Sequence, residues 1–165
     1  MNYRITGTGS CIPDITKKNS DFLQNKFLDR DGIDIQSSNS EIIEKFKSIT
    51  GIYQRRYASD EINSSDLATV AAKGAIVNSK IDQEKLDYII VAHNAGDISY
   101  NSGQVDTLPS IASKVKAKLK IKNPNCVAYD IICGCPGWLE GIIQAKSFIK
   151  SGMANKCLII CCDTL

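Results

Sequence analysis

Residues 129–138, YDIICGCPGW, hold the side chain of this sequence with the clearest capacity for chemistry. A hydrophobic run there delivers Cys135 into a Pro-Gly corner, and the sequence that follows has the apolar spacing of a helix. A thiol in such a place has three interpretations. It is a buried packing residue, half of a metal site, or a nucleophile.

The position of Cys135 favours the nucleophile. A thiol between a buried strand and the first turn of a helix faces unpaired N–H groups and the positive end of the helix dipole, and both stabilise the thiolate. Gly134 and Gly137 on either side allow a tight turn and leave space for a substrate to approach. Cys133 still belongs to the predicted strand, so we expect it to be a packing residue.

The other interpretations of these residues stay open on this evidence. Free cysteine is ordinary core material. The spacing of Cys133 and Cys135 is a poor zinc signal, because no second cysteine or histidine cluster accompanies it, and we expect no metal. The single histidine, His93, ends a predicted strand and is either a general base or a hydrogen-bonded loop residue.

Composition limits the class of protein. The 165 residues are 43% hydrophobic, which is enough for one globular domain with a core. The net charge is only +2, so we expect neither a nucleic-acid binder nor a membrane-surface binder. No apolar stretch approaches the ~20 residues that cross a bilayer, and the amino terminus lacks the apolar segment of a signal peptide. Seven cysteines, an odd number, fit free thiols in a reducing compartment, and we expect a cytoplasmic protein.

The elements that must position Cys135 alternate between strand-like and helix-like runs, which predicts an α/β domain with a largely parallel sheet. Strands are expected at residues 3–13, 86–94, 125–132 and 156–163. Helices are expected at residues 40–51, 64–80, 109–122 and 135–152. Residues 14–40 are polar and predict a short helix and an irregular loop.

Two helices carry specific expectations. Ser40 is expected to cap the helix at residues 40–51, and Gly51 is expected to end it. The helix at residues 64–80 is expected to begin with capping serines and to bury a face that includes Leu67 and Val70.

Seven segments cover nearly the whole chain in this order: RITGTGSCIP, TGIYQRR, SSDLATVAAKGAI, IDQEKLDYIIVA, PSIASKVKAKLKI, AYDIICGCPGW and FIKSGMANKCLII. Together they resemble the amino-terminal half of β-ketoacyl-acyl-carrier-protein synthase III, a member of the thiolase superfamily. The resemblance implies that residues 1–165 form one half of a thiolase-like fold, and that the carboxy-terminal half is absent from this chain. Such a half is a five-stranded mixed, mostly parallel sheet with helices on both faces.

The resemblance also implies a site and a reaction. In that family the cysteine at the start of the central helix accepts an acyl group from a thioester of coenzyme A or a carrier protein, and Cys135 is the matching residue. Malonyl-acyl carrier protein then decarboxylates and condenses with the acyl cysteine in fatty acid biosynthesis. The family uses a His and an Asn from its carboxy-terminal half for this step, and no cofactor is implied. Gly134 and Gly137 would line the substrate pocket, and Leu108 would reach across a homodimer to floor the partner's acyl pocket.

Some residues depart from the family pattern or extend it. Family members that use a coenzyme A primer carry a Trp and an Arg before TGI, where this chain has Lys45 and Ile49, so a different primer is expected. Arg55 and Arg56 lie beside the predicted entrance and are candidate contacts for a pantetheine arm or a carrier protein.

Two further hypotheses stand beside this one. The chain is alternatively half of another thiolase-fold acyltransferase or of a 3-hydroxy-3-methylglutaryl-CoA synthase-like enzyme, which the carboxy-terminal sequence would distinguish. It is alternatively a noncatalytic half that acts as an interaction or scaffold subunit. In that case Cys135 would be no more reactive than Cys133 or Cys11.

Overall fold

The computed structural model describes residues 3–102 and 104–164, and the chain divides into two compact units. The larger unit comprises residues 1–12 and 58–165, and the smaller unit comprises residues 13–57. The sequence predicts one domain, whereas the structure separates the polar region after residue 12, with the helix and strand that follow it, into a unit of its own. Cys135 lies in the larger unit.

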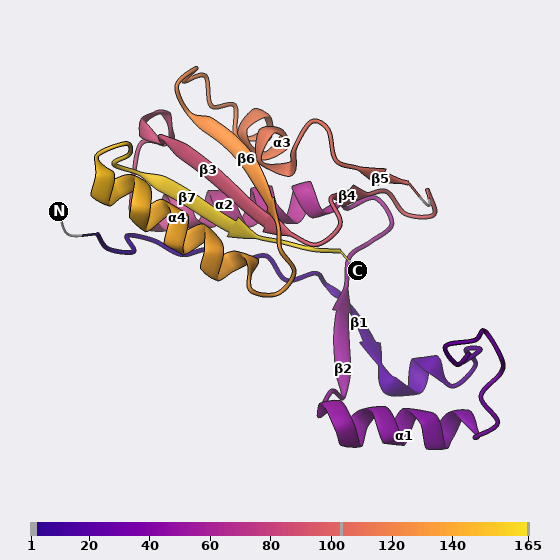
Figure 1. The fold of residues 1–165 in the computed structure, drawn as a ribbon. Helices are drawn as coiled ribbons and strands as arrows, with labels where there is room; N and C mark the ends of the chain where they lie inside the picture. The colour runs from indigo at the N-terminus through magenta and orange to yellow at the C-terminus, as the bar shows by residue number, and fades with distance from the viewer. Residues whose placement is uncertain (1–2, 103, 165) are drawn as a thin grey trace. The chain divides into compact units, whose positions relative to one another are not determined.

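A three-stranded parallel sheet forms the centre of the larger unit, in the order β6-β3-β7 (Figure 1). The strands are β3 (Tyr88–His93), β6 (Val127–Ile132) and β7 (Cys157–Cys161). β3 is the middle strand and is buried over nearly its whole length, as its continuous apolar sequence predicts. Tyr88 pairs with Val127 on one side and with Cys157 on the other, so the carboxyl ends of all three strands lie at one edge of the sheet.

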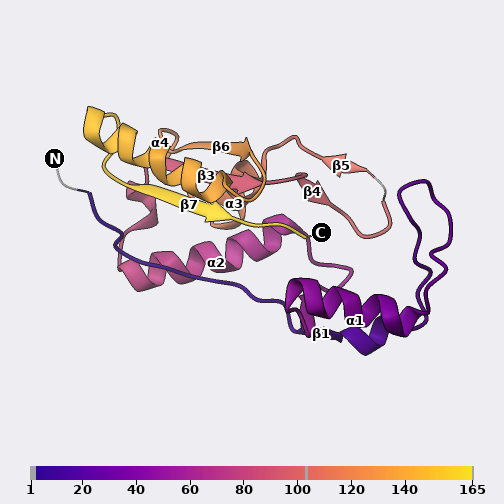
Figure 2. The ribbon, with the colours of Figure 1, turned by 60° about the horizontal axis from the view of Figure 1, so that its bottom comes forward.

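Helices cover both faces of this sheet, as predicted (Figure 2). The elements around the sheet are α2 (Ser64–Ser79), the short 3-10 helix η2 (Gln83–Lys85), β4 (Asp97–Ile98), β5 (Val105–Asp106), α3 (Ile111–Lys118) and α4 (Gly137–Ser151). α2 and α3 pack on one face, α4 packs on the other, and β4 and β5 form a small antiparallel hairpin. The α/β class is confirmed, and within the described residues the main sheet has three strands where five were expected.

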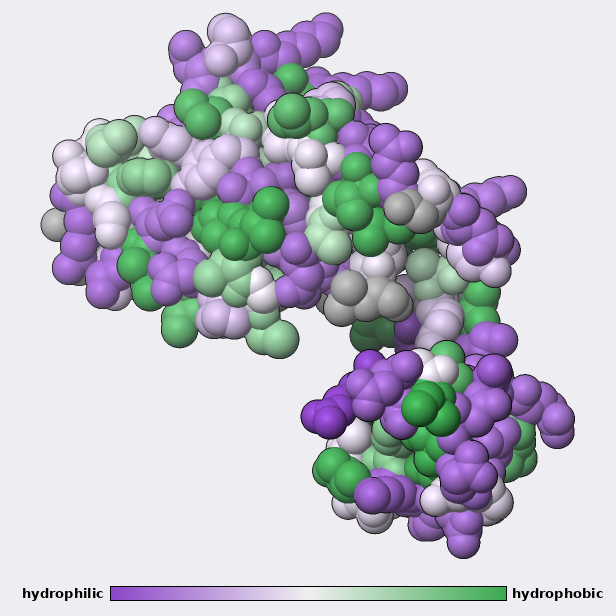
Figure 3. Space-filling view, turned by 45° about the vertical axis from the view of Figure 1, so that its right-hand side comes forward, coloured by the Kyte–Doolittle hydropathy of each residue, from purple (hydrophilic) through white to green (hydrophobic). Residues whose placement is uncertain are grey.

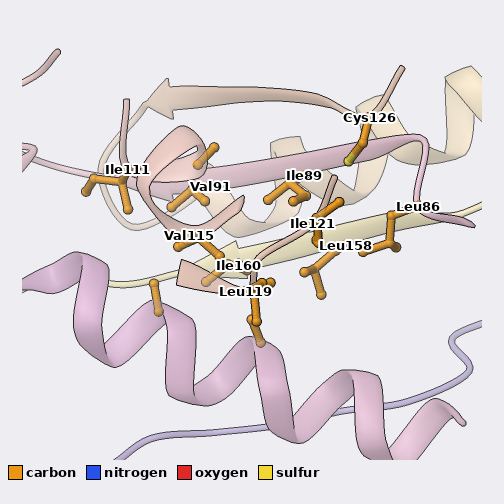
Figure 4. Close-up of a cluster of buried hydrophobic side chains, with 13 residues drawn as sticks. Leu86, Ile89, Val91, Ile111, Val115, Leu119, Ile121, Cys126, Leu158 and Ile160 are labelled. Atoms are coloured by element: carbon orange, nitrogen blue, oxygen red, sulfur yellow. The ribbon is translucent and has the colours of Figure 1, made fainter. Parts of the chain in front are cut away.

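The face under α2 and α3, which we call the covered face, holds the main hydrophobic core (Figure 4). Ile89 and Val91 of β3 are completely buried there, together with Ala68 of α2 and Val115 of α3. Full burial of one large aliphatic side chain contributes roughly 1.5–3 kcal/mol. The covered face is therefore a major source of stability for the larger unit.

Among the described residues, α4 packs on the opposite face of the sheet. We call this the open face, because the outer side of α4 is exposed. Glycines bring this helix close to the sheet, since a Cβ on Gly141 would lie 2.8 Å from Ile159 Cγ2. Leu139 and Ile143, on the outer side of α4, and Trp138, beside the cleft described below, are each about half exposed. Figure 3 likewise shows hydrophobic side chains at the surface of the larger unit. Exposed apolar clusters are typical of surfaces that pack against another domain or protein.

The amino-terminal segment, residues 3–12, does not form the predicted strand. It runs along α2 so closely that a Cβ on Gly7 would lie 2.6 Å from the backbone nitrogen of Ser79 (Figure 2). Thr8 N–H donates to Asn78 Oδ1 of that helix. A cleft of about 620 Å³ lies between the segment and β7, whose outer edge pairs with no strand in the described part of the chain. The prediction fails because a strand needs a hydrogen-bonded neighbour, and the cleft separates these two.

The smaller unit is a two-stranded antiparallel sheet with one α-helix. Its elements are β1 (Ile15–Lys18), the 3-10 helix η1 (Asn19–Phe22), α1 (Asn39–Thr50) and β2 (Gln54–Tyr57). α1 is capped by Ser38, whose hydroxyl accepts the Glu41 N–H, and not by the predicted Ser40. Gly51 ends the helix in the left-handed conformation, at φ +67°, as predicted.

α2 buries a different face from the predicted one. Ala68 and Ala72 are buried, whereas the predicted core residue Val70 is 52% exposed. The cap residue is Asn63 and not a serine. Small side chains let the helix approach the sheet closely, so size decides which face packs. Neither α2 nor any other helix in the described part of the chain is long and apolar enough to cross a bilayer.

Candidate active site

Cys135 lies in the connection between β6 and α4, at the carboxyl edge of the sheet. Gly134 is left-handed, at φ +55°, a conformation that favours glycine. Its carbonyl accepts the Gly137 N–H at 3.0 Å, which closes the turn. Pro136 is the cap residue of α4 and provides no side-chain hydrogen bond. The exposed Cys135 thiol therefore stands beside a helix start whose N–H groups have no side-chain cap.

Gly137 lies where α4 meets β3. A Cβ at this position would be 3.0 Å from Ala92 Cβ and 3.6 Å from Cys133 Cβ, so close packing requires glycine here. Its role as a lining residue of a substrate pocket stays a prediction. Cys133 is exposed and is not the packing residue expected from the sequence, because β6 ends one residue earlier, at Ile132.

The cysteines of β7 and its carboxyl end have raised pKa values. Burial raises the pKa of Cys157 to about 11 and the pKa of Cys162 to about 12. Burial also raises the pKa of Cys161, and the negative charge of Asp163 raises it further. Within the described residues no three metal-ligating side chains gather into a group that could hold an ion.

Two polar residues from neighbouring strand ends approach the Cys135 corner. Asp163 follows β7, and its carboxylate accepts the backbone N–H of Asn94 at 2.8 Å and the side-chain Nδ2–H of Asn94 at 2.7 Å. Asn94 follows β3, and its Oδ1 lies 3.3 Å from the position of a Cβ on Gly134. Neither residue is predicted from the sequence. The available signal is topological, because both follow the carboxyl ends of parallel strands, where ligands of α/β proteins bind.

His93 is 2% exposed, and both of its ring nitrogens are bonded. Nδ1 accepts the Gly96 N–H at 2.9 Å, so Nε2 carries the proton that it donates to Asp130 at 3.0 Å. The same carboxylate accepts the N–H groups of Ile111 and Ala112 at the start of α3. His93 therefore joins α3 to the sheet, which fits the interpretation as a hydrogen-bonded residue better than that of a general base.

The remaining predicted site residues lie in other parts of the chain. Leu108 is 83% exposed, in the loop before α3. Arg55 and Arg56 belong to β2 of the smaller unit. Arg55 donates to Asn19 Oδ1 at 3.1 Å, lies over the Phe22 ring and borders a cavity of about 200 Å³. Arg56 donates to two backbone carbonyls of the same unit.

A parallel sheet with helices on both faces, and an exposed cysteine where a strand leads into a helix, agree with half of a thiolase-like fold. Solved structures agree with this class. The 3-oxoacyl-[acyl-carrier-protein] synthase III of Aquifex aeolicus VF5 matches with a TM-score of 0.76 and 32% identity, over 99% of this chain and 46% of that chain. The enzyme from Thermus thermophilus matches with a TM-score of 0.72 and 28% identity, over 94% of this chain and 41% of that chain. OleA of Xanthomonas campestris, at 23% identity and a TM-score of 0.75 over 96% of this chain and 42% of that chain, shares the fold.

Sequence comparison points to the same enzymes. The family described as 3-oxoacyl-[acyl-carrier-protein (ACP)] synthase III matches residues 129–165. Beta-ketoacyl-[acyl-carrier-protein] synthase III 1 of Vibrio vulnificus (strain YJ016) is 33% identical over 165 residues, which are all of this chain and 45% of that protein. The chain is a relative of β-ketoacyl-acyl-carrier-protein synthase III and corresponds to the amino-terminal part of that family. It spans less than half the length of the curated relatives that it matches.

Proposed function

We propose that this chain is the acyl-accepting half of a condensing enzyme of the β-ketoacyl-acyl-carrier-protein synthase III type, with Cys135 as its nucleophile. The observation that carries the proposal is the placement of Cys135. It is exposed, at the carboxyl edge of a parallel sheet, and it directly precedes Pro136, the cap residue of the 15-residue helix α4. The family match over residues 129–165 includes this corner.

In the first step, the Cys135 thiolate attacks the carbonyl carbon of an acyl thioester of coenzyme A or of a carrier protein. A bond forms between Cys135 Sγ and the acyl carbon, the bond to the donor sulfur breaks, and the donor leaves as a thiol after taking a proton. N–H groups at a helix start stabilise the thiolate and the negative charge that develops on the carbonyl oxygen. Cys157 and Cys162 are poor competitors, because their pKa values are about 11 and about 12.

In the second step, malonyl-acyl carrier protein loses carbon dioxide, and the resulting carbanion attacks the acyl carbon on Cys135. A carbon–carbon bond forms, the thioester bond to Cys135 Sγ breaks, and the thiolate is released while the product stays on the carrier protein. The family resemblance implies a His and an Asn for this step. His93 is the only histidine of the chain, and it is buried and bonded to Asp130. Condensation therefore requires residues from outside these 165 positions.

The proposal extends to a cytoplasmic homodimer. The 83% exposure of Leu108 is what we expect of a side chain that enters the partner's acyl pocket. Gly134 and Gly137 are proposed to border the acyl group on Cys135. Arg55 and Arg56 are proposed to contact a pantetheine arm or the carrier protein that bears it.

Mass spectrometry of the intact protein tests the acyl-transfer step. The chain is incubated with a panel of acyl-coenzyme A and acyl-carrier-protein donors, and the modified peptide is then sequenced. We expect a mass increase of one acyl group that maps to Cys135 and is released by hydroxylamine. Cys133→Ser is the matched control and should still be acylated, whereas Cys135→Ser should not. Acylation at Cys133, or at no cysteine, would contradict the proposal.

A further inference from the structure

A pair of side chains, Asn94 and Asp163, joins the carboxyl ends of β3 and β7. The ladder between these strands continues past the end of β7, where Cys162 N–H donates to Ala92 O at 3.1 Å. Next to it, the Asp163 carboxylate accepts both the backbone N–H and the side-chain N–H of Asn94, at 2.8 and 2.7 Å. The backbone bond ties residue 94 to Asp163, and the side-chain bond to the same carboxylate fixes the orientation of the Asn94 side chain.

That orientation directs the Asn94 carboxamide oxygen at the turn before Cys135. Since Nδ2 of Asn94 is bonded to Asp163, Oδ1 is the opposite end of the carboxamide. Oδ1 lies 3.3 Å from the position that a Cβ on Gly134 would occupy. Gly134 holds φ +55° and immediately precedes Cys135. The backbone that sets the direction of the Cys135 thiol therefore packs against Asn94.

We propose that Asn94 and Asp163 are positioning residues for Cys135. Asp163 holds the Asn94 carboxamide, and the carboxamide confines the Gly134 turn so that the thiol stays beside the first turn of α4. This inference rests on the proposed role of Cys135 as the nucleophile. The pair also presents a neutral amide to the turn, where a carboxylate would disfavour the thiolate by repulsion between like charges.

Other titratable groups come from the four neighbouring elements. Cys133 follows β6, Cys161 ends β7, and Glu140 lies in the first turn of α4. On β3, His93 is bonded to Asp130. Substitutions at positions 94 and 163 leave all of these groups in place. A change in pH dependence among such variants therefore reports on the pair itself.

The test is site-resolved labelling of Cys135 by limiting iodoacetamide across pH ~5 to ~9, a range that brackets the ordinary titration of a thiol. We expect Asn94→Ala and Asp163→Asn each to slow the labelling of Cys135 about tenfold, the effect of losing one charge-assisted hydrogen bond. The exchanged variant, Asn94→Asp with Asp163→Asn, can rebuild both bonds: the backbone N–H of residue 94 would still donate to the side chain at position 163, and the bond between the two side chains would run in the opposite direction. It should recover the labelling rate at high pH but not at low pH, because the carboxylate now stands beside the thiol and disfavours the thiolate.

A matched control exists at the other end of the same strands. The Asp87 carboxylate accepts the backbone N–H groups of Asn155 and Lys156, and Asp87→Asn should leave the labelling of Cys135 unchanged. If Cys135 of the unmodified chain labels no faster than Cys133, the proposed function fails. If Cys135 labels fast in that chain and equally fast in all variants, the positioning role is wrong. Circular dichroism verifies folding, and the exchanged variant decides the question where a single variant does not fold.

Discussion

The two faces of the central sheet are built in different ways. On the covered face, Ile89 and Val91 are fully buried against two helices. On the open face, α4 packs through Gly137 and Gly141, and its other side leaves Leu139 53% exposed. On the covered face, helices of this chain bury the side chains of the sheet. On the open face, α4 is buried where it meets the sheet, and its other side is exposed.

The covered face mainly stabilises the larger unit, whereas the open face positions the cysteine that is proposed to react. The covered face gains its free energy from burying large aliphatic side chains against α2 and α3. On the open face, glycines in place of larger side chains let α4 approach the sheet closely. The start of that helix, and with it Cys135, therefore lies over the carboxyl end of β3. Its exposed apolar side agrees with a chain that spans 45% of its relatives' length.

Truncating one side chain on each face should give the largest contrast. Ile89→Ala removes a completely buried side chain and leaves a cavity, so we expect it to lower the free energy of unfolding by about 2–5 kcal/mol. Ile143→Ala, at a residue that is 45% exposed, should cost less than about 0.5–1 kcal/mol. Urea denaturation followed by circular dichroism measures both. Equal losses would remove the distinction between the faces.

Self-association tests the open face directly. Leu139 and Ile143 lie one helical turn apart on α4, and both are about half exposed. The double variant Leu139→Lys with Ile143→Lys should weaken association of the chain about tenfold, because two charges would have to be buried. Val77→Lys, at a 77% exposed position on α2, is the control and should not change it. Sedimentation velocity over a range of concentrations gives the comparison. A greater effect of the α2 control would assign the association to the other side of the molecule.

Asp97, a buried carboxylate of the larger unit, is expected to contribute less to the free energy of unfolding than the aliphatic core. Asp97 is 4% exposed, accepts the Ser65 N–H at 2.8 Å and pairs with Lys114 at 3.1 Å. Burial acts to raise the pKa of Asp97, but the hydrogen bonds from Ser65 and Lys114 outweigh it and hold the pKa below its ordinary value. Such a carboxylate stabilises the folded state above its unfolded pKa of ~3.9, and this contribution is lost as the pH falls through the folded value.

We therefore expect Asp97→Asn to cost about 1 kcal/mol of unfolding free energy near pH ~7, and progressively less as the pH falls below ~4. Urea denaturation at several pH values measures the difference from the unmodified chain. A cost that is the same at every pH would show that Asp97 acts through its shape and not through its charge.

Sequence patterns predicted the parts of the fold that depend on local chemistry. The continuous apolar run at Tyr88–His93 gave the buried central strand, and the strand-Gly-Cys-Pro-Gly order gave the corner that exposes Cys135. Gly51 and Gly152 end their helices in the left-handed conformation, as helix-stop rules predict. These features are encoded within a few neighbouring residues.

The features that sequence patterns missed depend on residues far apart in the chain. Asn94 and Asp163, which are hydrogen-bonded, lie 69 residues apart in the sequence. The residues around each of them do not predict that they pair. α2 buries Ala68 where the more hydrophobic Val70 was expected, because the neighbouring sheet selects the face by the room available. The segment at residues 3–12 has a strand-like sequence, but it lacks a strand partner.

We propose that Cys135 is the one activated thiol of the larger unit, and labelling compares it directly with its exposed neighbours. Cys133, Cys135 and Cys161 are all exposed, so access alone does not separate them. Limiting iodoacetamide is applied to the unmodified chain at pH ~6, where an ordinary thiol is protonated, and at pH ~8, where part of it is ionised. Labelling of each cysteine is quantified by peptide mass spectrometry. We expect Cys135 to label first at both pH values and to be the only one of the three that still labels quickly at pH ~6. Equal rates at Cys133, Cys135 and Cys161 would contradict it.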